Sequence, residues 1–194
     1  MAVTPNTTLI RRLDVALESD GFRRRGEHLE RRRGEVIDVL EFRKWSGATR
    51  AHTTFSANYG QILVPLYERL NDELPERLHI SECQLRGMYT LKDGTAFGFS
   101  VRESSDLDAV CADVVTRLRQ HVIAPMDARS SVADFIAFWR HGYGGITEAG
   151  RDTFMAILCT REGTDDANEW RARARKHVRG PSDEAQLAKL LGAG

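Results

Sequence analysis

Hydrophobic residues recur along this chain with two different periods, one helical and one strand-like. Between Leu9 and Leu17 the apolar positions fall three and four residues apart, which predicts a helix over residues 7–19 with an apolar stripe on one side. Asp20-Gly21 ends this helix, because glycine adopts the left-handed conformation at no steric cost.

The pattern then changes to that of strands. Residues 28–33, 35–45 and 50–59 are separated by short connections that contain glycine. The second stretch is rich in β-branched, aliphatic and aromatic residues, a composition typical of a strand buried on at least one face. The three stretches together predict an antiparallel meander.

A hairpin is predicted further along the chain. Residues 83–91 and 97–101 show strand-like alternation, and Asp93-Gly94 lies between them. An Asp-Gly pair between two alternating runs is a strong hairpin signal, since both turn residues need positive φ.

Helical spacing returns at residues 64–74 and continues through most of the chain after Glu103, where Ser105, Ser131 and Thr147 are suited to begin helices. Strands that cluster instead of alternating with helices indicate the α+β class. We expect a five-stranded, largely antiparallel sheet with helices packed on one face and a helical C-terminal extension. The glycine-rich loop near residues 142–145 places the boundary between an α+β domain, 1–141, and the extension, 142–194.

Composition narrows the class of protein. The 194 residues include 28 basic and 28 acidic side chains, so the formal net charge is zero, which argues against indiscriminate binding of polyanions. Apolar runs are far shorter than the ~20 residues of a membrane span. Cys83, Cys111 and Cys159 form no CxxC pair, and the first residues do not resemble a signal peptide. We expect a cytoplasmic protein.

The balanced charge conceals a strong preference for arginine over lysine. Of the 28 basic residues 24 are Arg, and 11 of these fall between residues 11 and 69. Arginine binds carboxylates and phosphates through two parallel hydrogen bonds, so the preference is compatible with recognition of anions. Codon bias in a GC-rich genome is the simpler explanation, because the arginines are spread along the whole chain.

A series of short motifs runs through residues 21–101. They are Gly21-Phe22-Arg23-Arg24-Arg25-Gly26, Leu29-x-Arg31-Arg32, Val36-Ile37-x-Val39-x-x-Phe42-x-Lys44, Asn58-x-Gly60 and Cys83-x-Leu85-Arg86. Together they resemble the bacterial domain of unknown function 4304 family, over residues 7–140. The chain departs from that family at Arg43, where the family usually has Gln, and at Met88, where it usually has Arg. The family has no assigned activity, so the resemblance implies a fold and not a function.

The first candidate site comprises polar residues on the predicted strands, namely Arg43, His52, Asn58 and Arg86. If these side chains share one face of the sheet, they form a polar pocket that could hold an anionic ligand. The alternative is an ordinary solvated sheet face, because antiparallel sheets often expose one side.

The second candidate site is a pair of arginine clusters at residues 23–25 and 31–33, represented by Arg24 and Arg32. Dense positive charge suits contact with an acidic partner, although the interspersed glutamates also fit a solvated edge that discourages sheet-to-sheet association. We expect no metal site, since His79 and Cys83 would lie about 13 Å apart in an extended chain. No motif predicts catalytic residues or a cofactor.

The leading hypothesis is therefore a non-catalytic binding module that holds an acidic protein or a small anionic ligand, for example an accessory or immunity-type protein of bacterial competition systems. One alternative is an enzyme acting on a phosphorylated or nucleotide substrate, with Arg43, His52 and Arg86 as clamps. A weak nucleic-acid binder is the other alternative, which the neutral net charge disfavours.

Overall fold

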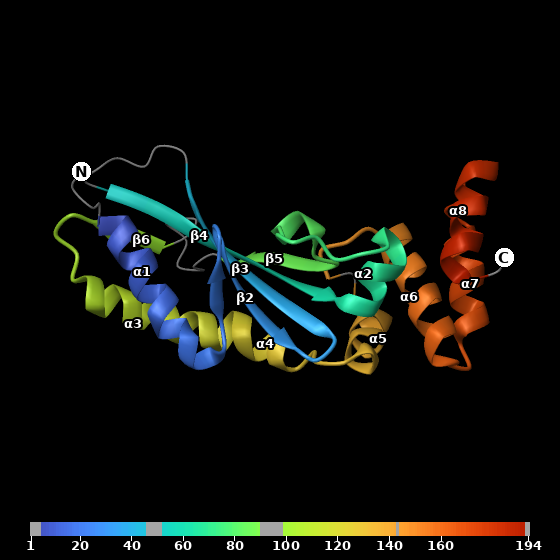
Figure 1. The fold of residues 1–194 in the computed structure, drawn as a ribbon, viewed down its shortest axis with the longest axis horizontal. Coiled ribbons are helices and arrows are strands. Elements are labelled where there is room, and N and C mark those ends of the chain that lie inside the picture. Colours follow the sequence, from blue (N-terminus) through green and yellow to red (C-terminus); the bar gives the residue numbers. More distant parts are fainter. Residues whose placement is uncertain (1–4, 46–51, 90–98, 143, 193–194) are drawn as a thin grey trace.

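Six strands form one sheet in the computed structural model of the chain, and every pair of neighbours is antiparallel (Figure 1). The structure describes residues 5–45, 52–89, 99–142 and 144–192. The strands are β1 (Arg23–Arg25), β2 (His28–Arg33), β3 (Val36–Lys44), β4 (His52–Leu63), β5 (Leu85–Tyr89) and β6 (Phe99–Arg102). The predicted α+β fold with a largely antiparallel sheet is confirmed, and β1 adds a short edge strand.

The predicted hairpin between residues 83–91 and 97–101 is wrong in its pairing. Both β5 and β6 pair with β4, and because each is antiparallel to β4 they run in the same direction. Strand β4 is longer than β5, so its first residues extend beyond the end of β5. Strand β6 forms backbone hydrogen bonds with these residues. The predicted turn at Asp93-Gly94 lies outside the described residues.

Helices pack around this sheet as two groups. They are α1 (Pro5–Leu17), α2 (Val64–Asn71), α3 (Leu107–Leu118), α4 (Ala124–Asp127), α5 (Val132–His141), α6 (Glu148–Glu162), α7 (Ala167–Arg175) and α8 (Pro181–Leu191), with short helical turns η1 (Glu18–Asp20), η2 (Ile80–Glu82) and η3 (Arg119–Ile123). Helices α1 and α3 lie side by side along the sheet, whereas α5–α8 gather beyond its other end, and α1 and α8 mark opposite ends of the long axis (Figure 1).

Helix starts follow the predicted caps in two cases out of three. The hydroxyl groups of Ser131 and Thr147 accept hydrogen bonds from the first turns of α5 and α6, as predicted. Helix α3 is instead capped by Asp106, while the Ser105 hydroxyl accepts from the backbone N–H of Arg102. Within the described residues no helix is both long and apolar enough to cross a membrane.

Three hydrophobic clusters hold these layers together. The first lies between one face of the sheet and the helices α1 and α3, and Leu13, Leu40 and Phe55 are fully buried in it. The second joins α5–α8 to the far end of the same face. The third, which includes Val39 and Tyr67, lies where α2 and the segment after it cover part of the opposite face.

The second cluster continues across the predicted boundary between residues 141 and 142. It contains Val36 and Trp139 from one side of that boundary together with Leu158 and Trp170 from the other. The C-terminal helices therefore pack on the sheet through α5.

The glycine-rich loop beside that boundary is held against strand β5. Gly144 and Gly145 have φ of 56° and 81°, a conformation that side chains other than glycine rarely adopt. The carbonyl of Gly144 accepts from the Arg86 N–H at 3.4 Å, and a Cβ on Gly145 would lie 2.4 Å from the Arg86 carbonyl oxygen. These close backbone contacts leave no room for a side chain, so packing of the loop against β5 requires glycine at these positions.

Asp166 links α5 to α7 and carries a testable pH dependence. The Thr164 hydroxyl, the Trp170 Nε1–H and the Arg140 guanidinium all donate to its carboxylate and lower its pKa from 3.8 to about 2. A depressed pKa contributes stability above the unfolded value, and this contribution is lost as pH falls toward the folded value.

We expect the free energy of unfolding of the unmodified chain to fall between about pH 5 and pH 3. In the Asp166→Asn variant this fall should be smaller by about 0.5–1 kcal/mol, a figure that allows for solvent screening. Urea unfolding at both pH values measures this difference. Asp165, an exposed neighbour in sequence, provides the matched control as Asp165→Asn, which should titrate like the unmodified chain. Equal losses in the two Asn variants would contradict the role given to Asp166.

Candidate functional site

The strand register places all four residues of the first predicted site on one face of the sheet. Successive residues of a strand point to opposite faces. Arg43 pairs with Ser56, Asn58 with Met88, Arg86 with Gly60 and His52 with Arg102, so every member of these pairs lies on the face opposite α1 and α3. We call this the open face, because α1 and α3 lie on the other side of the sheet. Among the described residues, α2 and the segment after it cover the part of this face that contains Ile37, Val39 and Ile62.

Three of the four residues lie close together and one does not. Arg43, Asn58 and Arg86 occupy diagonal positions on β3, β4 and β5. His52 lies six residues before Asn58, roughly 20 Å along the strand, where its Nε2 is 2.5 Å from the Ser100 hydroxyl. The structure therefore does not assemble the four residues into a single pocket.

A shallow hollow of about 380 Å³ lies on the open face beside these three positions. Its lining residues are Arg43, Lys44, Trp45, Ser56, Asn58 and Met88. The floor is Ser56, which is 3% exposed, and the larger side chains of neighbouring strands rise on either side of it. A small residue on a central strand between large residues on its neighbours leaves this depression.

The open face is rich in arginine. Its exposed arginines, which we call the basic face, are Arg23, Arg25, Arg32, Arg43, Arg86 and Arg102. The nearest carboxylates on the same face are Glu30 and Glu41, at 3.7 Å from Arg32 and 3.5 Å from Arg43. These separations are long for charge-assisted hydrogen bonds, so the guanidinium groups keep most of their bonding capacity for solvent or a ligand.

Arg43, Asn58 and Arg86 differ in how firmly they are held. Asn58 donates to Glu41 at 3.4 Å, and Arg86 donates to the Ser81 carbonyl at 2.9 Å. The Arg43 side chain is 69% exposed and has only its long contact with Glu41 among the described residues. Arg43 is therefore the cation at the hollow that can reorient most easily toward an anion.

The second predicted site is divided between the two faces of the sheet. Arg24 pairs with Leu29 and points to the helix-covered side, where Asp14 of α1 accepts two hydrogen bonds from it at 2.5 and 2.6 Å. Arg32 pairs with Ile37 and lies on the open face with 61% of its side chain exposed. Arg24 and Arg32 thus cannot contact one partner surface together.

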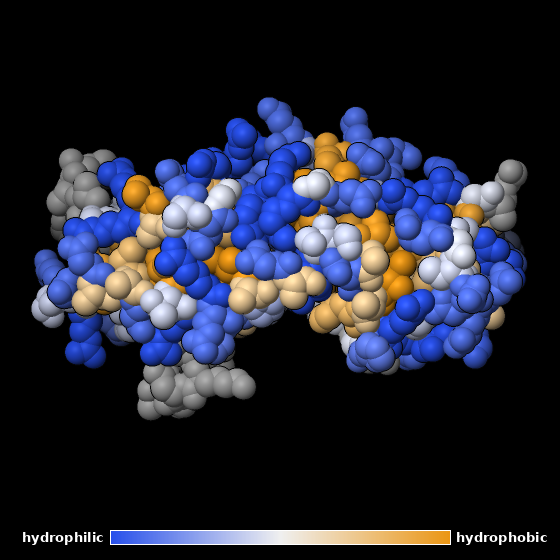
Figure 2. All heavy atoms as spheres, turned by 90° about the horizontal axis from the view of Figure 1, so that it is seen from below, coloured by the Kyte–Doolittle hydropathy of each residue, from blue (hydrophilic) through white to orange (hydrophobic). Residues whose placement is uncertain are grey.

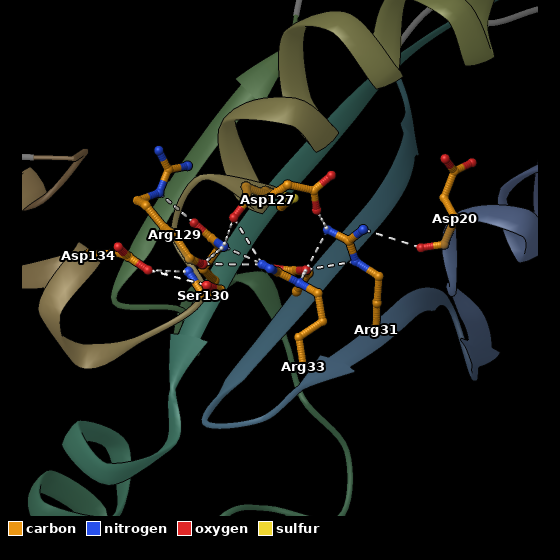
Figure 3. Close-up of polar contacts among 10 residues, drawn as sticks. Asp20, Arg31, Arg33, Asp127, Arg129, Ser130 and Asp134 are labelled. Carbon is orange, nitrogen blue, oxygen red and sulfur yellow. Dashed lines mark hydrogen bonds and ion pairs between the residues drawn. The ribbon is translucent and has the colours of Figure 1, made fainter.

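The two arginines next to Arg32 in sequence form hydrogen bonds within the protein. Arg31 and Arg33 point to the helix-covered face, where both donate to the fully buried Asp38 carboxylate at 2.8 Å (Figure 3). Gln61 donates to the other oxygen of Asp38, also at 2.8 Å. We call these four residues the polar belt, because they cross the sheet between its first and second hydrophobic clusters.

Residues at the end of α4 form hydrogen bonds with the polar belt. Arg33 and Gln61 both donate to the backbone carbonyl of Met126, at 2.9 and 3.1 Å, and Arg129 donates to Gln61 at 2.7 Å. Burial alone would lower the pKa of Arg33, but the hydrogen bond and charge of Asp38 raise it. Figure 3 shows these groups pointing toward one another, and we interpret the belt as the joint that fixes α4 and α5 on the sheet.

Cys83, His79 and the other cysteines do not form a reactive or metal-binding cluster. Burial raises the pKa of the Cys83 thiol to about 12, so the nucleophilic thiolate is scarce at neutral pH. Its sulfur contacts the backbone carbonyl of His79 at 3.8 Å. Among the described residues no three His, Cys, Asp or Glu side chains come together as a potential metal site.

Sequence reasoning did not identify the hollow or the polar belt. Met88 and Trp45 were read as strand residues, although the alternation of β3 and β5 places them on the same face as Arg43. Asp38 is not among the predicted site residues. Its position among apolar residues at alternate places of β3 was the available signal that it is buried.

No family model, no curated protein and no solved structure matches this chain. The resemblance to the domain of unknown function 4304 family accordingly remains an expectation. The function is therefore argued from the geometry alone.

Proposed function

We propose that this protein is a non-catalytic binding module whose basic face holds an acidic protein partner. The observation that supports it is the set of exposed arginines on the open face without a close carboxylate partner, whereas Arg24 and Arg119 on the helix-covered side are paired with Asp14 and Asp20 at 2.5 and 2.9 Å. Arginine-rich surfaces attract carboxylates over a range set by ionic strength, so such a face favours encounter with acidic partners. The family resemblance and a role as an accessory or immunity-type protein are compatible with this proposal.

The enzymatic alternative has less support. A phosphate clamp by Arg43, His52 and Arg86 requires these groups to converge on one ligand, whereas neither His52 nor Arg86 lines the hollow and His52 lies roughly 20 Å along the strand from Asn58. The hollow is also shallow, and a binding surface for a larger partner needs no enclosed pocket. The three cysteines are free thiols, which suits the reducing cytoplasmic setting we expect.

The proposal is tested by reversing charge on the open face. We expect Arg43→Glu/Arg86→Glu to weaken binding of a fluorescein-labelled poly-glutamate chain at least tenfold at low salt, a loss of about 1.4 kcal/mol or more, because attraction becomes repulsion at two positions. Fluorescence anisotropy measures the affinity.

The matched control places the same charge change on the opposite side of the molecule. Arg11→Glu/Arg117→Glu alters exposed or half-exposed arginines of α1 and α3 and should leave the affinity within about twofold. Equal weakening by both double variants would show that general charge, and not the basic face, attracts the probe. Tighter binding of single-stranded DNA than of poly-glutamate would favour the nucleic-acid alternative.

A further inference from the structure

We propose that the partner segment recognised by the basic face is an acidic stretch with a bulky apolar residue at its centre, which enters the hollow beside Met88. This inference rests on the proposed function and adds a second requirement to it. Charge alone would bind any acidic chain, whereas the hollow selects among acidic chains by an apolar anchor.

Met88 is the first observation that supports an anchor. Among the described residues the two large hydrophobic side chains classed as exposed are Val15, at 69%, and Met88, at 49%. Val15 lies on α1 on the other side of the molecule, where hydrophilic residues cover most of the visible surface and apolar residues appear as separate patches (Figure 2). Met88 instead lines the hollow, and methionine adapts its shape to varied apolar partners.

The arrangement of residues around Met88 is the second observation. Trp45 lines the hollow from the position directly after β3, and Ser56 and Asn58 form its floor on β4 between Trp45 and Met88. Arg43 and Lys44 complete the lining. Two apolar side chains on opposite walls, with cations beside them, are an arrangement in which one anchor supplies affinity and the neighbouring charges supply orientation.

The size and openness of the depression define the occupant. A volume of about 380 Å³ accommodates one or two large side chains but not a folded element. Arg43 on β3 and Arg86 on β5 lie on the two strands that flank β4, so an acidic segment with carboxylates on both sides of the anchor would meet a guanidinium group at each side. The segment that meets both conditions is a short acidic peptide carrying Phe or Leu between runs of Asp and Glu.

Two labelled peptides of equal charge test the requirement for an anchor. One has ten Asp and Glu residues with Phe-Leu at the centre, and the other has Ser-Ser in place of Phe-Leu. We expect the full chain to bind the Phe-Leu peptide about tenfold more tightly in fluorescence anisotropy at moderate salt. Met88→Asp should remove this preference, while Val15→Asp, which changes the other exposed apolar residue, should keep it.

The outcomes separate this inference from the proposed function. Equal affinity for both peptides, with loss of both in Arg43→Glu/Arg86→Glu, would overturn the anchor and retain the acidic partner. Failure of both peptides and of poly-glutamate to bind would overturn both proposals. A preference for Phe-Leu that persists in Met88→Asp would place the anchor site elsewhere, and thermal unfolding of Met88→Asp at the unmodified midpoint shows that the variant is folded.

Discussion

Asp38→Asn is expected to destabilise the folded chain by about 3–5 kcal/mol, the largest effect we predict for a single substitution. The Asp38 side chain has no exposed surface and receives hydrogen bonds from Arg31 and Arg33. Removing its charge leaves two guanidinium groups without their buried counter-ion, and the cost of burying unpaired charge is high. Urea unfolding followed by circular dichroism measures the change.

Asp127 provides a control on the same arginine. Its carboxylate lies 2.7 Å from the Arg31 guanidinium, as that of Asp38 does, but 52% of the Asp127 side chain is exposed. We expect Asp127→Asn to cost less than about 1 kcal/mol, since water replaces an exposed partner. Similar losses for Asp38→Asn and Asp127→Asn would contradict the view that the polar belt is a buried structural joint.

Removal of residues 142–194 is expected to abolish cooperative unfolding of the remaining chain. Truncation would uncover Trp139, Val36 and Leu63, which are fully buried in the second hydrophobic cluster. Each large apolar side chain contributes about 1.5–3 kcal/mol when buried, and the total stability of a domain is about 5–15 kcal/mol. Thermal unfolding of the fragment 1–141, together with dye binding to exposed apolar surface, measures the result.

A shorter truncation separates loss of the cluster from loss of chain length. The fragment 1–180 lacks α8, whose buried residue in the second cluster is Leu187, at 7% exposure. It should unfold cooperatively at a lower midpoint than the full chain. Cooperative unfolding of 1–141 with nearly full stability would instead support the boundary predicted from the glycine-rich loop.

Local sequence signals predicted the elements that local physics decides. The period of apolar residues located α1 and β3, and the side-chain oxygens of Ser131 and Thr147 marked the starts of α5 and α6. The strand pairing predicted from the Asp93-Gly94 signal was wrong, and the signal itself lies outside the described residues. It concerns neighbouring residues, whereas the pairing of β5 and β6 was decided by the length of β4, a distant strand.

The candidate site likewise depends partly on local sequence patterns and partly on long-range packing. Alternation along one strand is a property of the sequence, but the register between strands, which the structure supplies, puts Arg43, Asn58 and Arg86 on one face. Alternation also separates Arg32 from its neighbours Arg31 and Arg33, but it does not say which set is buried. That depends on where α1, α3 and α4 pack, which sequence spacing does not encode.

By itself, the sequence determined most of the helices and strands and the alternation of side chains along each strand, because these follow from contacts between residues close in the chain. The tertiary structure alone decided how the arginines are used. Arg31 and Arg33 meet a buried carboxylate and the carbonyls of a distant helix, Arg24 meets Asp14, and Arg43 remains at the hollow. The physical reason is that the free energy of a charged side chain is set by the groups that surround it after folding.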